Sequence, residues 1–406
     1  MTLQFNAMAL AILILSAVQG CSVPDSSATA TPSAPVLAVH YESAPLIPVT
    51  IAGEQYQFLL DTGASITVID RRLASRFKAL SLSELPRAYQ ADFANVASVS
   101  GQVGSDQLGF VQPVPFSVGS VTIDDSDLWG TMDFELFSQS IGTRIDGVLG
   151  IDTIRRFNWV FDNEQHQISA SLRVPSAAAF ERCIGYEDSY NRSPAIYLTH
   201  GESSVRMYLD TGADQSYVDR AFIDFMADQS YVDRAFIDFM ADKQALLGAG
   251  ASPRKGADAS GMQAASEHIL TDLQFDERPL GQLRVSENGN DKYALGLDFV
   301  NRFKRFAIIP GRMMICYDAG SLARQLPPFL RNIAVRFDGQ HLQIYYNDEQ
   351  ALTPYGLKNG DLIERVNGVA YRPIEIDKVR ELLNISKPGS LKMRVIREGK
   401  ALDIAI

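Results

Sequence analysis

The sequence predicts a mainly β protein with two homologous lobes followed by a smaller α+β unit. Residues 45–63 and 194–212 align without gaps, and each segment has a β-rich run, a Gly-containing turn and a second run ending in Asp-Thr-Gly. The charge balance changes near the end: residues 321–406 carry 13 basic and 10 acidic side chains, in a chain of net charge −11. A chain of 406 residues has room for three such units.

The composition narrows the class of protein. Hydrophobic residues make up 46% and charged residues 21%, so there is enough apolar side chain to bury a core, and a mostly disordered chain is excluded. The acidic balance argues against a nucleic-acid partner. The three cysteines, Cys21, Cys183 and Cys316, are too few for a disulfide scaffold, and their spacing suits no zinc site, so no metal is expected. Cys183 and Cys316 either pair in an oxidising compartment or remain buried thiols.

The first 20 residues are expected to be a signal peptide. Residues 1–24 contain no charged side chain, and their densest apolar stretch, 7–18, is too short to span a bilayer. The small residue Gly20 precedes Cys21, which resembles the bacterial lipoprotein signal and implies a lipid on Cys21. The alternative is an ordinary signal peptide with a chance cysteine. Residues 21–37 are rich in Ser, Ala, Thr and Pro and are expected to form a flexible tether. Ser22 follows the cysteine. By resemblance to lipoprotein sorting, the absence of Asp at this position implies the outer membrane.

The first lobe is expected over residues 38–175 and the second over 185–318. The two Asp-Thr-Gly triplets are 149 residues apart, and two later Leu-Gly pairs, at Leu149 and Leu295, are 146 residues apart. A repeat of this length forms no solenoid, so the two copies are expected to make a pseudo-dimer within a monomeric chain.

The chemistry of two Asp-Thr-Gly triplets explains their residue types. Ionisation of both of two facing carboxyls has a high free-energy cost, because their negative charges repel. Asp61 and Asp210 are therefore expected to share one proton. One then takes a proton from water while the other donates a proton to a carbonyl oxygen. Gly63 and Gly212 let backbone N–H groups approach the carboxylates, and the hydroxyls of Thr62 and Thr211 can brace the two loops.

These motifs resemble the aspartic peptidases of the pepsin and retropepsin kind, over most of residues 40–318. The segments 145–150 and 294–296, with their apolar-apolar-Gly pattern, strengthen the resemblance. It implies a bilobal fold of two small β-barrels. The pair of aspartates, called the dyad below, is then expected at the lobe interface. The resemblance also implies an endopeptidase that hydrolyses protein or peptide substrates without a cofactor, with Asp61 and Asp210 as the catalytic pair.

Two details of the resemblance affect the site. Many pepsin-like members have Ser or Thr after the glycine, whereas this chain has Ala64 and Ala213. Without those hydroxyls the ionised pair is less favoured, which predicts an activity optimum above about pH 3. A mobile flap is expected at a hairpin tip with Gly101 and Gly104, with its second-lobe counterpart near residues 256–261. The alternative is two ordinary surface turns.

The second lobe contains an exact tandem duplication. Residues 214–227 read DQSYVDRAFIDFMA, and residues 228–241 repeat them. The first copy keeps the correct offset from Asp210, so it is expected to supply the strand and helix of the lobe, and the second copy is expected to be extruded. Deletion of residues 228–241 is expected to preserve or raise activity and stability.

The last unit is expected over residues 325–406. It contains Gly356-Leu357, Gly360-Asp361 and Asn367-Gly368, followed by helical periodicity over 376–383 and a strand over 391–396. This pattern resembles a PDZ domain of the bacterial periplasmic type, which implies binding of an extended peptide at a sheet edge. The apolar loop that receives a terminal carboxylate in that family is not evident, so a docking or structural appendage is the alternative.

Together these features predict an aspartic endopeptidase of the bacterial cell envelope, anchored by a lipid and facing the periplasm. The alternative is a catalytically degenerate peptide-binding or assembly lipoprotein that acts through its PDZ-like domain.

Overall fold

The structure is a computed structural model. It describes residues 34–92, 107–188, 192–219, 254–258, 261–265, 267–288, 293–327, 330–331, 333–345 and 349–406. The predicted signal peptide, Cys21, most of the tether, the flap candidates Gly101 and Gly104, and the second copy of the duplication lie outside these residues. Within the described part of the chain, no helix is both long and apolar enough to cross a membrane.

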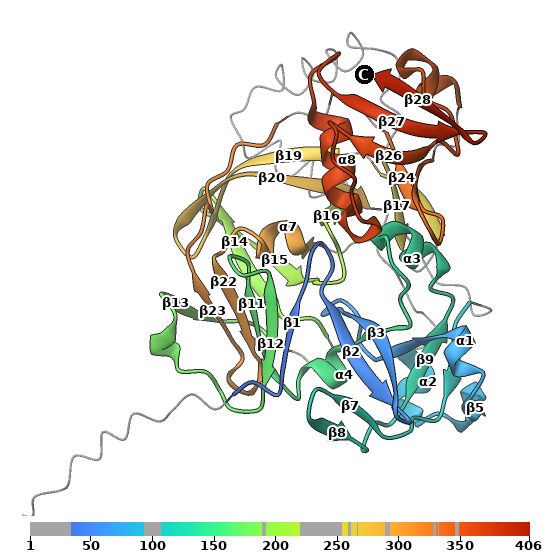
Figure 1. Cartoon of the computed structure of the whole chain (residues 1–406). Coiled ribbons are helices and arrows are strands. Elements are labelled where there is room, and N and C mark those ends of the chain that lie inside the picture. Colours follow the sequence, from blue (N-terminus) through green and yellow to red (C-terminus); the bar gives the residue numbers. More distant parts are fainter. Residues whose placement is uncertain are drawn as a thin grey trace, which may run out of the picture. The chain divides into compact units, whose positions relative to one another are not determined.

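The first lobe is a nine-stranded mixed sheet (Figure 1). Its central hairpin is the predicted one: β2 (Leu46–Ile51) pairs antiparallel with β3 (Glu54–Leu60) across a turn in which Ala52 and Gly53 have positive φ. Across the sheet the strands are β5 (Ala79–Leu80), β6 (Gly109–Val111), β9 (Trp129–Met132), β4 (Val68–Asp70), β10 (Gly147–Leu149), β3, β2, β7 (Phe116–Val118) and β8 (Val121–Ile123). The helices of this lobe are α1 (Arg71–Ala74), α2 (Arg87–Asp92), α3 (Glu135–Ile141) and α4 (Ile151–Ile154), with a 3-10 turn at Leu82–Glu84.

The second lobe closes into a barrel, whereas the sheet of the first lobe has two ends, β5 and β8. The barrel strands, in order, are β14 (Ala195–His200), β15 (Ser203–Leu209), β21 (Ala294–Leu295), β16 (Ser216–Asp219), β20 (Arg278–Asn288) and β19 (Glu267–Phe275), and α7 spans Leu297–Val300. The first copy of the duplication therefore supplies β16. A separate antiparallel hairpin, β17 (Arg254–Asp258) with β18 (Gly261–Ala265), occupies the segment predicted as the second-lobe flap counterpart.

A six-stranded sheet joins the lobes. Its order is β1 (Leu37–His40), β12 (Gln167–Ser171), β11 (Asn158–Asp162), β22 (Arg305–Ile309), β23 (Met314–Asp318) and β13 (Arg182–Gly185). The central pair comes from different lobes, since β11 runs antiparallel to β22 with Trp159 opposite Ile308. Side chains from both lobes, such as Trp159 and Phe306, belong to one continuous buried core. The lobes are thus joined by shared strands and a shared core.

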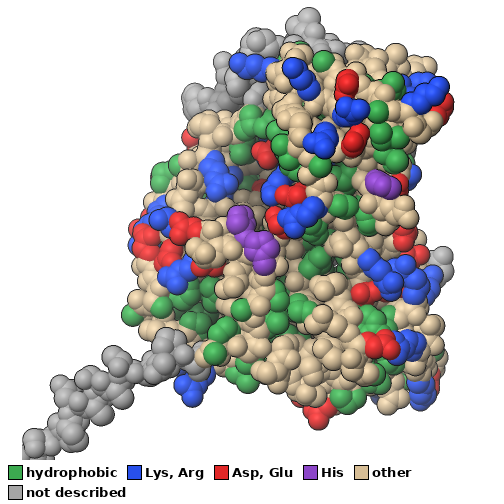
Figure 2. Space-filling view, in the orientation of Figure 1, with side chains coloured by type: hydrophobic (Ala, Val, Ile, Leu, Met, Phe, Trp, Pro, Cys, Tyr) green, Lys and Arg blue, Asp and Glu red, His purple; other side chains and the backbone are tan. Residues whose placement is uncertain are grey.

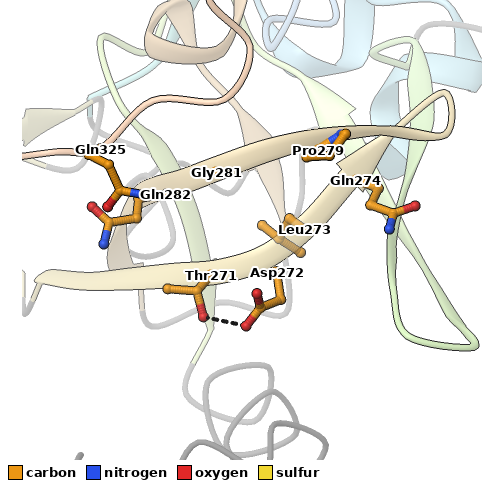
Figure 3. A pocket seen from close by; sticks show the side chains of 8 residues that line it. All are labelled: Thr271, Asp272, Leu273, Gln274, Pro279, Gly281, Gln282 and Gln325. Atoms are coloured by element: carbon orange, nitrogen blue, oxygen red, sulfur yellow. Dashed lines mark hydrogen bonds between the residues drawn. The ribbon is translucent and has the colours of Figure 1, made fainter.

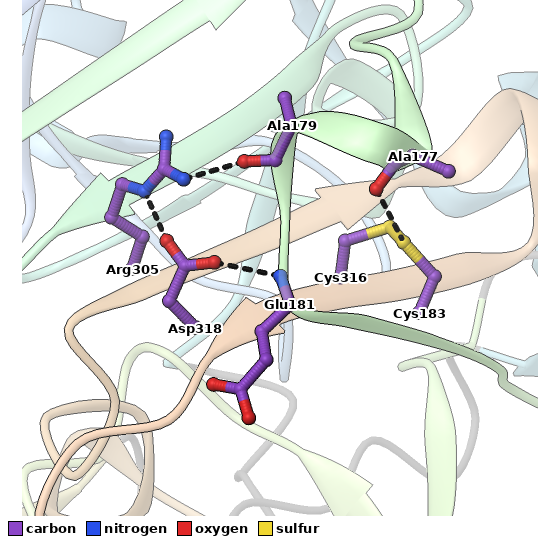
Figure 4. Close-up of a disulfide and its surroundings, with 7 residues drawn as sticks. All are labelled: Ala177, Ala179, Glu181, Cys183, Arg305, Cys316 and Asp318. Atoms are coloured by element: carbon purple, nitrogen blue, oxygen red, sulfur yellow. Dashed lines mark hydrogen bonds and ion pairs between the residues drawn. A yellow bond between two sulfur atoms is a disulfide. The ribbon is translucent and has the colours of Figure 1, made fainter.

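The two body cysteines are bonded to one another (Figure 4), which decides between the two alternatives that the sequence leaves open. Cys183 on β13 lies directly opposite Cys316 on β23, with their Cα atoms 4.0 Å apart. Nearby, Asp318 pairs with Arg305 and accepts the backbone N–H of Glu181 at 2.8 Å. The disulfide therefore ties an edge strand of the joining sheet to its neighbour.

The C-terminal unit is a five-stranded antiparallel sheet with its own core. The order is β24 (Val335–Phe337), β25 (Leu342–Ile344), β26 (Leu362–Val366), β27 (Lys392–Arg397) and β28 (Lys400–Ala405). The predicted helix is α8 (Ile376–Ile385), which buries Val379 and Leu383 in that core. Additional 3-10 turns span Ala177–Ala179, Pro310–Arg312, Glu349–Tyr355 and Pro373–Glu375.

The motif residues of this unit have structural roles. Asp361 is 1% exposed and receives two hydrogen bonds from the Arg397 guanidinium, at 2.7 and 2.6 Å. Asn367 and Gly368 both have positive φ in the turn after β26, a conformation that favours these two residue types.

On the face of the molecule shown in Figure 2, basic and acidic side chains are interspersed.

Candidate active site

Asp61 and Asp210 occupy equivalent places in the two lobes. Each follows a central strand directly, Asp61 after β3 and Asp210 after β15. The backbone N–H of Asp61 donates to the carbonyl of Leu149 at 3.1 Å, and that of Asp210 donates to the carbonyl of Leu295 at 2.9 Å. The two Leu-Gly pairs of the sequence repeat thus hold the two Asp-Thr-Gly loops.

The glycines of those Leu-Gly pairs are required by close packing. A Cβ atom at Gly150 would lie 2.3 Å from the backbone of Ile66, and one at Gly296 would lie 2.7 Å from that of Gln215. Any side chain here would push the Asp-Thr-Gly loop away from the strand that anchors it.

The two carboxyl groups are bound in matching ways. Asp61 Oδ1 accepts the N–H groups of Gly63 (2.7 Å) and Ala64 (3.2 Å). Asp210 Oδ1 accepts those of Gly212 (3.0 Å) and Ala213 (3.2 Å).

Each loop glycine also lies against the opposite carboxyl. A Cβ atom on Gly63 would lie 2.6 Å from the Asp210 carboxyl, and one on Gly212 would lie 2.3 Å from that of Asp61. The structure therefore brings the two predicted loops face to face.

The threonine side chains lock the two loops together. Thr62 Oγ1 donates to the carbonyl of Leu209 at 2.6 Å and accepts the N–H of Thr211 at 3.0 Å. Thr211 Oγ1 donates to the carbonyl of Leu60 at 2.7 Å and accepts the N–H of Thr62 at 3.1 Å. Both side chains are fully buried, so each hydroxyl satisfies buried backbone groups of the other lobe.

The environment of Asp61 favours its protonated form. Burial raises the pKa of Asp61 well above its usual value, and the negative charge of Asp210 and a hydrogen bond with that carboxyl raise it further. The N–H groups of Gly63 and Ala64 act in the opposite direction but do not compensate. Asp61 is nevertheless partly exposed, so a water molecule can reach the two carboxyls.

Each loop has a second, half-buried carboxyl behind it. Thr67 Oγ1 donates to Asp152 at 2.9 Å, and Ser216 donates to Asp298 from both its N–H (2.8 Å) and its hydroxyl (2.7 Å). Burial raises the pKa of Asp152, and it raises the pKa of Asp298 to about 6. Each of these aspartates lies two residues after the glycine of a matched Leu-Gly pair, so the internal repeat is a sequence signal that could have predicted them.

Tyr217 is the site residue that sequence reasoning missed. Its hydroxyl donates to Asp210 Oδ2 at 2.8 Å, and its side chain is 7% exposed. The prediction from Ala64 and Ala213 considered only the hydroxyls missing after the two glycines, and it did not include this donor to Asp210. The donor comes from β16, seven residues after the aspartate, and no local sequence pattern predicts the direction of that side chain.

A shallow cavity of about 520 Å³ lies apart from these residues (Figure 3). It is formed around the β19–β20 hairpin by Thr271, Asp272, Leu273, Gln274, Pro279, Gly281, Gln282 and Gln325. The register of the hairpin shifts beside Leu273, and Thr271 donates to the Asp272 carboxyl at 2.9 Å. None of the predicted site residues lines this cavity. Among the residues that the structure describes, no three His, Cys, Asp or Glu side chains are grouped so as to hold a metal ion.

Comparison with known proteins bears on the first lobe. Residues 47–153 match the family model described as "Aspartyl protease". A search of curated proteins finds no match to the chain. The matched segment contains the first Asp-Thr-Gly loop and the Leu149-Gly150 anchor, and the second lobe repeats their geometry outside the match. The first lobe is thus similar to aspartyl proteases of the retropepsin type, which supports a general aspartic protease function.

Proposed function

We propose that this chain is an aspartic endopeptidase acting on extended protein or peptide substrates. The observation that carries the proposal is the meeting of two Asp-Thr-Gly loops, each bound to the other by its threonine and packed by its glycine against the opposite carboxyl. Two carboxyls placed side by side in this way can share one proton, which is what general acid–base attack by water requires.

The reaction proceeds in two balanced steps. The ionised carboxylate takes a proton from water as the water oxygen bonds to the peptide carbonyl carbon, and the carbonyl oxygen takes the proton held by the other carboxyl. The resulting diol then collapses: the amide nitrogen gains a proton from the first carboxyl, the C–N bond breaks, and one diol hydroxyl returns a proton to the second. The products are a carboxylic acid and an amine, and the pair again holds one proton.

The Asp variants test this proposal. Purified full chain is expected to cleave a mixed peptide library, and Asp61→Asn and Asp210→Asn are each expected to lose at least about 100-fold in kcat/KM, because each removes half of the acid–base pair. Asp125→Asn is the matched control, since Asp125 is an exposed carboxyl in the same lobe that pairs with Arg156. Equal rates in the wild type and both dyad variants would rule the proposal out and favour the peptide-binding alternative.

We further propose that the enzyme is a lipoprotein of the bacterial outer membrane that faces the periplasm. The uncharged apolar segment before Cys21 and the polar tether after it support an anchor. The disulfide between Cys183 and Cys316 fits an oxidising compartment. The intact mass of the protein extracted from membranes would show the acyl chains, and a mass matching the unmodified chain would contradict the anchor.

For the C-terminal unit we propose a PDZ-like role in peptide docking. β24 is one of the two end strands of its sheet, and at such an edge an extended peptide can add one more strand. Arg380 on α8 already donates to the carbonyl of Val335 on β24, at 3.2 and 2.8 Å, so a docked peptide would displace this contact. Capture of peptides by the Asp61→Asn chain tests binding without cleavage.

A further inference from the structure

The two halves of the dyad differ in one hydrogen-bond donor. Asp61 accepts two loop N–H groups, whereas Asp210 accepts two equivalent N–H groups and the hydroxyl of Tyr217. The position equivalent to Tyr217 in the first lobe, 149 residues earlier, is Val68, whose side chain has no hydrogen-bond donor. The pseudo-symmetry of the site is therefore broken at this position.

The Tyr217 hydroxyl is held in place by the barrel. β16 lies between β20 and β21, with Tyr217 opposite Ser286 on one side and Ala294 on the other. The preceding residue, Ser216, is anchored by two hydrogen bonds to Asp298. The donor is therefore buried and preorganised.

We propose that Tyr217 is a positioning residue that assigns the roles within the dyad. By donating to Asp210 it makes Asp210 the carboxylate that takes the proton from water, and it leaves Asp61 as the acid that gives its proton to the carbonyl oxygen. A hydrogen bond to a carboxylate favours the ionised form, and Asp210 has three such donors against two for Asp61. The raised pKa of Asp61 agrees in direction with Asp61 as the carboxyl that holds the proton. This inference rests on the proposed function, because the roles concern its reaction.

Other ionisable groups near the dyad also influence it, and their influence must be distinguished from that of the Tyr217 hydroxyl. Burial raises the pKa of Asp298, behind Ser216, to about 6, and the hydrogen bond from Ser216 and the charge of Arg302 act in the opposite direction. Asp152 occupies the equivalent place behind the first loop. The remaining charged or titratable groups on or next to β16, β20 and β21 are Asp214, Asp219, Arg278, Arg284, Glu287 and Tyr293. None of them changes when only the Tyr217 hydroxyl is removed.

The duplication provides a matched control. Tyr231 occupies the same place in the second copy as Tyr217 in the first. Deleting either copy yields the same polypeptide, so deletion cannot tell which tyrosine acts on the dyad. Point substitutions can, since Tyr217→Phe and Tyr231→Phe differ only in which copy loses its hydroxyl.

The experiment measures kcat/KM against pH for the full chain and these two variants. In Tyr217→Phe the acid limb is expected to move to higher pH by about one unit, with activity on that limb about tenfold lower, because the ionised pair has lost a charge-assisted hydrogen bond. Tyr231→Phe is expected to follow the wild-type profile. Thermal unfolding of Tyr217→Phe, which keeps the aromatic ring, checks that the variant is folded.

A second measurement is independent of turnover. Carbon-13 NMR of labelled Asp carboxyls is expected to show that the lower titration step of the pair moves up by about one unit in Tyr217→Phe. The inference would be overturned if the folded Tyr217→Phe variant kept both the lower carboxyl titration step and the acid limb of the kcat/KM profile at their wild-type pH. A shift caused by Tyr231→Phe instead would also overturn it. If the wild type cleaves no peptide, the proposed function fails, and the carboxyl titration alone decides whether Tyr217 directs the proton.

Discussion

Gly212→Ala is expected to abolish measurable peptide cleavage. The added Cβ would lie 2.3 Å from Asp61 Cγ and 2.5 and 2.6 Å from the carboxyl oxygens, closer than Cβ atoms approach other heavy atoms. The Asp61 carboxyl cannot simply rotate away, because the N–H groups of Gly63 and Ala64 hold one of its oxygens. Displacement of a reacting group by about 1 Å costs on the order of 100-fold, so a loss of at least about 100-fold in kcat/KM is expected.

The matched substitutions make this result interpretable. Gly63→Ala is expected to behave similarly, since its Cβ would lie 2.6 Å from the Asp210 carboxyl. Gly311→Ala is the control, because no atom lies within 4 Å of its added Cβ. Wild-type kcat/KM in a folded Gly212→Ala variant would show that the two carboxyls do not face one another as described.

Thr62→Val and Thr211→Val are each expected to lower the free energy of unfolding by about 2–4 kcal/mol. Valine preserves the shape of threonine, but Thr62→Val leaves the carbonyl of Leu209 and the N–H of Thr211 without their partner. Each buried polar group left unpaired costs about 1–3 kcal/mol. Because these hydrogen bonds cross between the lobes, their loss should also disturb the geometry of the dyad and lower the cleavage rate.

Urea unfolding with serine variants isolates the hydroxyl. Thr62→Ser keeps the hydroxyl and loses only a methyl group, so it should retain most of the stability that Thr62→Val loses. The same comparison applies to Thr211 in the second lobe. If the Val and Ser variants unfolded at the same urea concentration, the bonds between the loops would not contribute to stability.

Much of the site was predictable because its determinants are local and repeated. The hairpin β2–β3 follows from a β-rich run, a Gly-containing turn and a second run, and it delivers Asp61 at the end of a strand. The same pattern in the second lobe delivers Asp210. The helical periodicity over residues 376–383 likewise corresponds to α8. Turn chemistry and residue period act over a few residues, so a single sequence reveals them.

Other features depend on contacts between distant segments. The sequence left the pairing of Cys183 with Cys316 open, because only the register of β13 against β23 places them opposite one another. The resemblance implied a small β-barrel in each lobe, but only the second lobe closes into a barrel, whereas the sheet of the first lobe has two ends. These outcomes depend on how strands pair across the fold, which local propensity does not determine.

The dyad shows the division most clearly. The sequence by itself determined that two carboxyls, each followed by Thr and Gly, would be presented by two copies of one lobe. Only the tertiary structure decided that the copies are unequal, because β16 directs the Tyr217 hydroxyl at Asp210 while Val68 holds the equivalent place in the first lobe. The physical reason is that a motif specifies which groups can react, whereas the donors around each group depend on the packing of strands that lie far apart in the chain.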